Sequence, residues 1–291
     1  MYELVNVKNN TYYVNCPAKI GVYVDGNYAY LIDSGNDKDA GKKVKRILDE
    51  MGLTLKAIIN THSHADHIGG NNFLQKQTDC KIYAKGIEKA FTLSPILEPS
   101  FLCGSYPQKA LLHKFLYAES SVCEDIESAV LPIGFEIVDL PGHSFEMIGV
   151  RTPDNVLFIG DSVSCSATIE KYGIGYTYNV SEFLDTLDKL DTLSAGFFVP
   201  SHADVCEDLH EIVEINRKSV NSVCEQILSL LHDPKTFEDL LSGVFAVYNL
   251  TMTNEQYVLI GSTVKSYLSY LKDSGKVETS FENNYMIYKT V

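Results

Sequence analysis

Residues 60–71 read Asn-Thr-His-Ser-His-Ala-Asp-His-Ile-Gly-Gly-Asn and place three imidazoles and one carboxylate within six positions, at His62, His64, Asp66 and His67. Packing does not account for such a cluster, because unpaired imidazoles and a carboxylate gathered at one point are groups that bind a metal cation. In an extended loop, His62 and His64 point the same way and can share one cation. Asp66 and His67 follow where the chain turns toward a helix, so they can face a second cation.

The residues around this cluster predict where it lies in a fold. Residues 56–60 form a short run with the β-branched Ile58 and Ile59, which is typical of a buried strand, and residues 68–71 lead into a helix. A further strand is expected at 80–84, which makes residues 56–84 a β-loop-α-β unit. Ligands gather outside the carboxyl ends of strands in α/β sheets, so the cluster is expected on such an edge.

Four polar residues outside residues 60–71 share one local pattern, in which an apolar run and a turn precede the polar side chain. They are Asp33, His143, Asp161 and His202. Each of them is therefore expected at the end of a strand, on the same edge as residues 60–71. A strand meander is expected over 11–32, and further strands over 135–139, 147–150 and 156–159.

The motif His62-x-His64-x-Asp66-His67 resembles the signature of the metallo-β-lactamase superfamily of hydrolases. Asp33, His143, Asp161 and His202 are similar, in the same order over residues 31–204, to the other four motifs of that family. The resemblance implies a four-layer αβ/βα sandwich in which Asp33 is a structural acid. It also implies two sets of metal ligands. The first set is His62, His64 and His143; the second is Asp66, His67 and His202; Asp161 bridges both.

The mixed nitrogen and oxygen ligands favour two divalent cations, most simply Zn²⁺, with iron or manganese as alternatives. The resemblance implies a hydrolase that uses a metal-bridging hydroxide on a small ester, thioester or lactone, and Asp66 can orient that hydroxide. The metal site resembles the glyoxalase II-like branch. The carboxylate at Asp161 counts against antibiotic hydrolysis, and the imidazole of His64 counts against oxygen reduction, because those branches typically carry other residues there.

Two other functions stay open. A phosphodiesterase or ribonuclease is favoured if lysines and arginines converge on the metal rim. A metal-bound sensor or interaction protein is the non-enzymatic alternative, although such a module has little need for a complete set of ligands.

Residues 171–178 place three tyrosines and two glycines close after Asp161. Tyr176 could supply a hydroxyl to an oxyanion, or it could be part of the pocket wall. Residues 92–130 are rich in aromatic and apolar side chains interrupted by prolines, which predicts an inserted, partly helical flap. The flap could be an active-site lid, an oligomer contact or packing material on the core.

The predicted catalytic domain spans residues 1–206, and a helical domain resembling a winged helix spans 207–291. Helices are expected over 207–231, 236–247 and 254–271, followed by a hairpin. From Val205 onward there are seven Lys and Arg against twelve Asp and Glu, which argues against nucleic-acid binding. Homodimerisation or substrate positioning is the expected role of this part.

Composition is ordinary for a globular protein of 291 residues, with 45% hydrophobic and 21% charged residues. The net charge of −14 argues against a large polyanionic partner, although bound cations would offset it locally. Seven cysteines without CxxC spacing predict no disulfide framework, and packing is the expected role of Cys165 near Asp161. No apolar run approaches a membrane span, so we expect a cytoplasmic protein with a small-molecule substrate.

Overall fold

The computed structural model describes residues 2–291 and shows two packed β-sheets with helices outside each of them. The strands of the first sheet follow one another in chain order. They are β1 (Glu3–Lys8), β2 (Thr11–Asn15), β3 (Ile20–Asp25), β4 (Tyr28–Ile32), β5 (Thr54–Ile59), β6 (Lys81–Ala84) and β7 (Glu124–Asp125). The strands from β1 to β4 are antiparallel, as a meander requires, and those from β4 to β7 are parallel.

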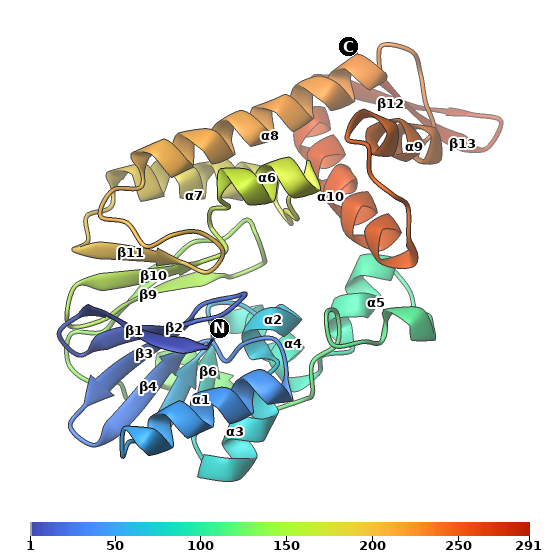
Figure 1. The fold of residues 1–291 in the computed structure, drawn as a ribbon. Helices are drawn as coiled ribbons and strands as arrows, with labels where there is room; N and C mark the ends of the chain where they lie inside the picture. Colours follow the sequence, from blue (N-terminus) through green and yellow to red (C-terminus); the bar gives the residue numbers. More distant parts are fainter. Residues whose placement is uncertain (1) are drawn as a thin grey trace.

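The second sheet has the strand order β11-β10-β9-β8. Its strands are β8 (Glu136–Asp139), β9 (Ile148–Arg151), β10 (Val156–Gly160) and β11 (Phe197–Pro200). Figure 1 shows α1 (Lys38–Glu50) and α3 (Asn71–Thr78) outside the first sheet, and α7 (Val180–Thr192) and α8 (His210–Leu230) outside the second. The four layers predicted from the sequence are confirmed.

The alternation of side chains along β4 and β5 shows why the layers form. On β4, Leu31 belongs to the apolar core under α1, whereas Ile32 belongs to the core between the two sheets. On β5, Ile58 and Ile59 divide in the same way. Successive residues of a strand face opposite sides, so β-branched runs buried on both faces hold a central pair of strands between two cores.

The C-terminal part has the predicted order of three helices and a hairpin. After α8 come α9 (Phe237–Val247), α10 (Asn254–Asp273), β12 (Val277–Glu282) and β13 (Tyr285–Thr290). One apolar cluster runs from the second sheet through α7 and α8 into α9 and α10, with Leu157, Leu187, Val220 and Leu241 among its members. The boundary between residues 206 and 207 and the likeness to a winged helix remain predictions.

The flap is partly helical, as predicted, and contains α5 (Leu97–Cys103) and the 3₁₀ turns η1 (Lys109–Leu111) and η2 (Ile126–Ser128). It packs against α10, because Leu102, Leu111 and Leu116 form one apolar cluster with Val258. The Nε2 atom of His113 lies 2.5 Å from Glu255 Oε1 at the start of α10. The flap and α10 are therefore packed against each other.

The sequence predicts a helix over 181–193 with Ser181 as its N-cap, and the start of this helix, α7, differs in the structure. Ser181 is not the N-cap of α7, because the side-chain oxygen of Asn179 accepts hydrogen bonds from the N–H groups of Ser181 and Glu182 at 3.1 and 3.3 Å. Asn and Ser are both strong caps, so the local sequence does not separate them.

Among residues 2–291, no helix is both long and apolar enough to cross a membrane.

Gly69 allows the ligand-bearing segment to lie against the loop after β4. A Cβ atom on Gly69 would lie 2.4 Å from the backbone carbon of Asn36 and 2.6 Å from the backbone nitrogen of Asp37. We therefore expect Gly69→Ala to lower the free energy of unfolding, measured by urea denaturation, by about 1–3 kcal/mol. The clash is with backbone atoms, which cannot move as freely as the end of a flexible side chain. Gly175→Ala is the matched control, since nothing lies within 4 Å of that position. Equal stability losses in both variants would contradict this packing.

Candidate metal centre

All seven predicted ligands lie at the carboxyl ends of strands or in the short helix that follows one. His62 and His64 follow β5, Asp66 and His67 lie on α2 (Ala65–Ile68), His143 follows β8, Asp161 follows β10, and His202 follows β11. The structure brings them together in two groups whose ligand atoms lie within 4.8 Å of one another. The first group is His62, His64 and His143; the second is Asp66, His67, Asp161 and His202.

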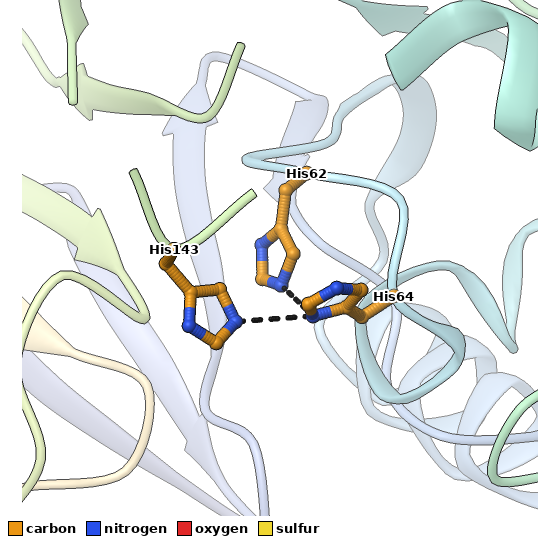
Figure 2. A group of neighbouring side chains, drawn as sticks. All are labelled: His62, His64 and His143. Carbon is orange, nitrogen blue, oxygen red and sulfur yellow. Dashed lines mark hydrogen bonds between the residues drawn. The ribbon is translucent and has the colours of Figure 1, made fainter. Parts of the chain in front are cut away.

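The first group consists of three imidazoles that converge on one point (Figure 2). The Nδ1 atom of His64 lies 3.0 Å from His62 Nε2 and 3.0 Å from His143 Nε2. Three converging ring nitrogens are the protein ligands of a catalytic Zn²⁺ site that keeps one position open.

In the second group, Asp161 lies between the histidines. Its Oδ1 atom is 3.2 Å from His67 Nε2, and its Oδ2 atom is 3.3 Å from His202 Nε2. The Nε2 atom of His202 is also 3.4 Å from Asp66 Oδ2. Asp161 Oδ2 lies 3.6 Å from His143 Nε2 of the first group, so this carboxylate faces both groups.

Two buried atoms of the second group fit a cation. Among the described residues, neither His67 Nε2 nor Asp161 Oδ1 makes a hydrogen bond, although they lie 3.2 Å apart. A buried polar atom without a partner is costly, so such atoms in native proteins usually have one. A divalent cation would satisfy both atoms, and imidazole with carboxylate is a ligand set that binds such ions.

Asp33 orients two ligand rings, that of His67 directly and that of His62 through Thr61. Its Oδ2 atom lies 2.7 Å from His67 Nδ1, and it accepts hydrogen bonds from the Thr61 N–H and hydroxyl, both at 2.8 Å. The Thr61 hydroxyl oxygen lies 3.0 Å from His62 Nδ1. Because each Nδ1 atom has a partner, the Nε2 atoms of His62 and His67 are left for the metal side.

Two further contacts come from residues that the sequence did not single out. The Nδ1 atom of His202 lies 2.9 Å from the carbonyl oxygen of Pro17. The Nε2 atom of His64 lies 3.7 Å from Glu98 Oε1 in the flap helix α5. Burial, with the charges of Glu88 and Asp66, raises the pKa of Glu98 to about 8. The flap thus brings an acidic group to the metal centre.

The two groups hold protons differently. Burial lowers the pKa of His64 and of His143 to about 4 and holds the pKa of His62 well below its usual value, so these rings are neutral at pH 7. In the second group, the charge of Asp161 raises the pKa of His202 to about 10. Although burial opposes the shift, neighbouring carboxylates also raise the pKa of His67 well above its usual value.

Tyr176 lies beside the first group. Its ring centroid is 5.1 Å from that of His64 and 5.7 Å from that of His143, and both rings are nearly perpendicular to it. Burial, together with the charges of Glu98 and Glu88, holds the pKa of Tyr176 well above its usual value, although the nearby Ser262 of α10 opposes this shift. The phenol therefore keeps its proton at neutral pH.

Cys165 lies outside both ligand groups among the described residues. It precedes α6 (Ser166–Tyr172), and its Sγ atom lies 3.3 Å from the hydroxyl oxygen of Thr168. Together with Lys19 and His202 it lines a cavity of about 260 Å³. The expectation that Cys165 has only a packing role remains a prediction.

The model of the metallo-beta-lactamase superfamily matches residues 14–202, which contain both ligand groups. The chain belongs to the metallo-β-lactamase superfamily. A relative from Drosophila melanogaster, named beta-lactamase-like protein 2 homolog, is 23% identical over 91% of this chain and 86% of its own. Hydroxyacylglutathione hydrolase 1 of Vibrio vulnificus is 27% identical over 70% of each chain.

Solved structures of the superfamily share the fold along nearly the whole chain. A metallo-beta-lactamase family protein from Thermus thermophilus has a TM-score of 0.72 at 18% identity and covers 97% of this chain and 99% of its own. A beta-lactamase domain protein from Burkholderia ambifaria has a TM-score of 0.74 at 15% identity, over 99% of this chain and 94% of its own. Superfamily membership confirms the predicted hydrolase class, whose members typically bind divalent metals.

Metal binding is expected to release protons from the second group only. At pH 7, a divalent cation must displace the protons that the nearby carboxylates favour on His67 and His202, whereas His64 and His143 are already neutral. The affinity of the second group therefore rises as pH increases toward about 10. Titration calorimetry in buffers of different ionisation enthalpy measures this release for each binding step. Two steps with the same proton count would contradict the difference between the groups.

Proposed function

We propose that this superfamily member is a binuclear Zn²⁺-dependent hydrolase that cleaves a small ester, thioester or lactone. The position of Asp161 carries the proposal, because its carboxylate lies 3.3 Å from His202 Nε2 and 3.6 Å from His143 Nε2, between the two ligand groups. Such a placement suits a bridging ligand. The two groups supply the remaining six side chains, with His62 and His64 joining His143, and Asp66 and His67 joining His202.

Two bound divalent cations would lower the pKa of a water toward neutrality and polarise the carbonyl group that is cleaved. Asp66 is ionised at neutral pH, because the charges of His67 and His202 lower its pKa to about 2 although burial opposes this. Its carboxylate can accept a hydrogen bond from the attacking water and orient it. The protonated phenol of Tyr176 can donate a hydrogen bond to the oxyanion that forms.

A cavity next to Tyr176 is large enough for a small substrate. It has a volume of about 650 Å³ and lies between the flap and α10, with Phe101, Tyr178, Ser262 and Lys265 among its lining residues. Ser262 lines this cavity and lies close to the phenol of Tyr176, which packs beside the first ligand group. Pockets for small molecules commonly have volumes of about 300–1,000 Å³.

The charge of the rim favours a small acyl compound over a nucleic acid. Among the described residues that line the cavity along α10, Lys265 is the one Lys or Arg. Beside His202 the corresponding cation is Lys19, whose Nζ atom already donates to the carbonyl oxygen of Ala203. Binding a nucleic-acid backbone takes several such contacts. The name of the Vibrio vulnificus relative supports an acyl compound, because an acylglutathione is a thioester.

The C-terminal part suits a role in positioning substrate. We infer that residues 1–206 form the catalytic domain and that 207–291 form a helical domain whose helix α10 supplies one wall of the cavity. Homodimerisation, a cytoplasmic location and the likeness to a winged helix belong to the same proposal.

Asp161→Ala tests the proposed hydrolase. We expect purified wild type to contain two equivalents of Zn²⁺ and to cleave a thioester reporter, and the variant to lose at least about 100-fold in kcat/KM, since even changes to residues that only support a metal ligand cost about 10–100-fold. Metal content is measured by plasma emission spectrometry. Asp185→Ala, an exposed carboxylate on α7, is the control and should match wild type. Cleavage of a phosphodiester reporter alone would favour the nuclease alternative, and activity indifferent to Asp161 would contradict the proposal.

Tyr176→Phe tests the oxyanion donor. The ring packing against His64 and His143 is kept and only the hydroxyl is lost, so kcat should fall by about 10²–10³-fold while KM and metal content stay unchanged. Tyr178→Phe removes a hydroxyl from the same cavity without touching either histidine, and it should alter KM more than kcat. An unchanged kcat for Tyr176→Phe would assign Tyr176 to the pocket wall.

A further inference from the structure

Glu88 is a buried acid that neither ligand group includes. It lies on α4 (Gly86–Leu93), the helix that follows β6, and its exposed fraction is 1%. The carboxylate Oε2 accepts hydrogen bonds from the Ser63 N–H at 3.0 Å and from the Ser63 hydroxyl at 2.5 Å. Ser63 is the residue between His62 and His64, so Glu88 is hydrogen-bonded to the loop that carries two ligands of the first group.

The other carboxylate oxygen of Glu88 is hydrogen-bonded to the loop that carries the third ligand. Its Oε1 accepts hydrogen bonds from the Ser144 hydroxyl at 2.5 Å and from the Glu146 N–H at 3.0 Å. Ser144 follows His143 directly. The Ser63 loop follows β5 of the first sheet, and the Ser144 loop follows β8 of the second. One carboxylate therefore ties together the two loops, from different sheets, that bring in all three imidazoles.

The charge of Glu88 has no balancing cation in the protein. Among the described residues, no Lys, Arg or His nitrogen lies within 4.0 Å of its carboxylate, and its four donors are neutral N–H and O–H groups. A buried carboxylate without a cation is costly unless its charge is offset nearby. The three imidazoles on the two loops that it joins are the place where a divalent cation would supply that charge.

We propose that Glu88 is a positioning residue for the first metal group: it fixes the distance between the two loops, and its negative charge favours a cation at His62, His64 and His143. This inference rests on the metal centre proposed above. Glu88 acts through Ser63 and Ser144, and neither it nor these serines need touch substrate.

Glu88→Gln is the primary test, because it keeps the side-chain size but removes the charge and turns an NH₂ group toward donors. We expect the affinity of the first group for Zn²⁺ to fall by about 10–100-fold, with the affinity of the second group unchanged. Competition with a chromophoric chelator gives the two dissociation constants. The visible spectrum of the Co²⁺-loaded protein, with the paramagnetically shifted N–H signals of the ligand histidines, shows which group is disturbed.

Two further variants separate positioning from general stability. Ser144→Ala removes one of the four hydrogen bonds and should cause a smaller loss in the same direction, which keeps the test valid if Glu88→Gln does not fold. Asp154→Asn is the matched control, because that carboxylate accepts hydrogen bonds from the Asn10 N–H at 2.9 Å and the Thr11 hydroxyl at 2.8 Å, at the opposite ends of the strands. It should lower stability without changing either metal affinity.

The outcomes separate this inference from the proposed function. Two cations in wild type with a selective loss at the first group in Glu88→Gln and Ser144→Ala support it. If both variants bind two cations with unchanged affinities and an unchanged Co²⁺ spectrum, the positioning role of Glu88 is overturned and the proposed function stands. This holds even if both variants have lower melting temperatures. A wild type that binds no divalent cation would overturn the proposed function together with the inference.

Discussion

The candidate metal centre depends on the contacts of Asp33, a buried carboxylate directly after β4 with an exposed fraction of 1%. Its hydrogen bonds to the N–H and hydroxyl of Thr61, and its 2.7 Å contact with His67 Nδ1, join two neighbouring parallel strands at the point where the ligand loop begins. Asp33 has a φ of +63°, a conformation that costs energy in a residue with a side chain. The network around it compensates for that strain and sets which nitrogen of His67 faces Asp161.

Much of the centre could be predicted because it is encoded locally. His62, His64, Asp66 and His67 are adjacent in sequence, and an apolar run that ends in a turn and a polar residue marks the end of a strand. Since carboxyl ends of neighbouring strands meet at one edge, separate runs predicted one rim. The four layers were implied by the resemblance to the metallo-β-lactamase superfamily, and the structure shows their physical basis, because strands buried on both faces, such as β5, have a core on each side.

The contacts that tie the loops together could not be predicted in this way. Glu88 and Glu98 lie in short helical segments without a ligand motif, and their partners are 25 or more residues away or come from another sheet. Pro17 contributes only its backbone carbonyl to His202, which no side-chain pattern reveals. The N-cap of α7 was misplaced at Ser181 for a related reason: Asn179 and Ser181 are equivalent caps in sequence, and only the tertiary path of the chain selects one.

The central claim is that Asp161 joins two cations in one binuclear centre. Electron paramagnetic resonance of the protein loaded with two equivalents of Mn²⁺ tests this most directly, because cations about 3.5–4 Å apart and sharing a bridging carboxylate are magnetically coupled. The account predicts a coupled spectrum in wild type that gives way to isolated Mn²⁺ signals in Asp161→Ala. Isolated signals in the wild type at two equivalents would contradict it.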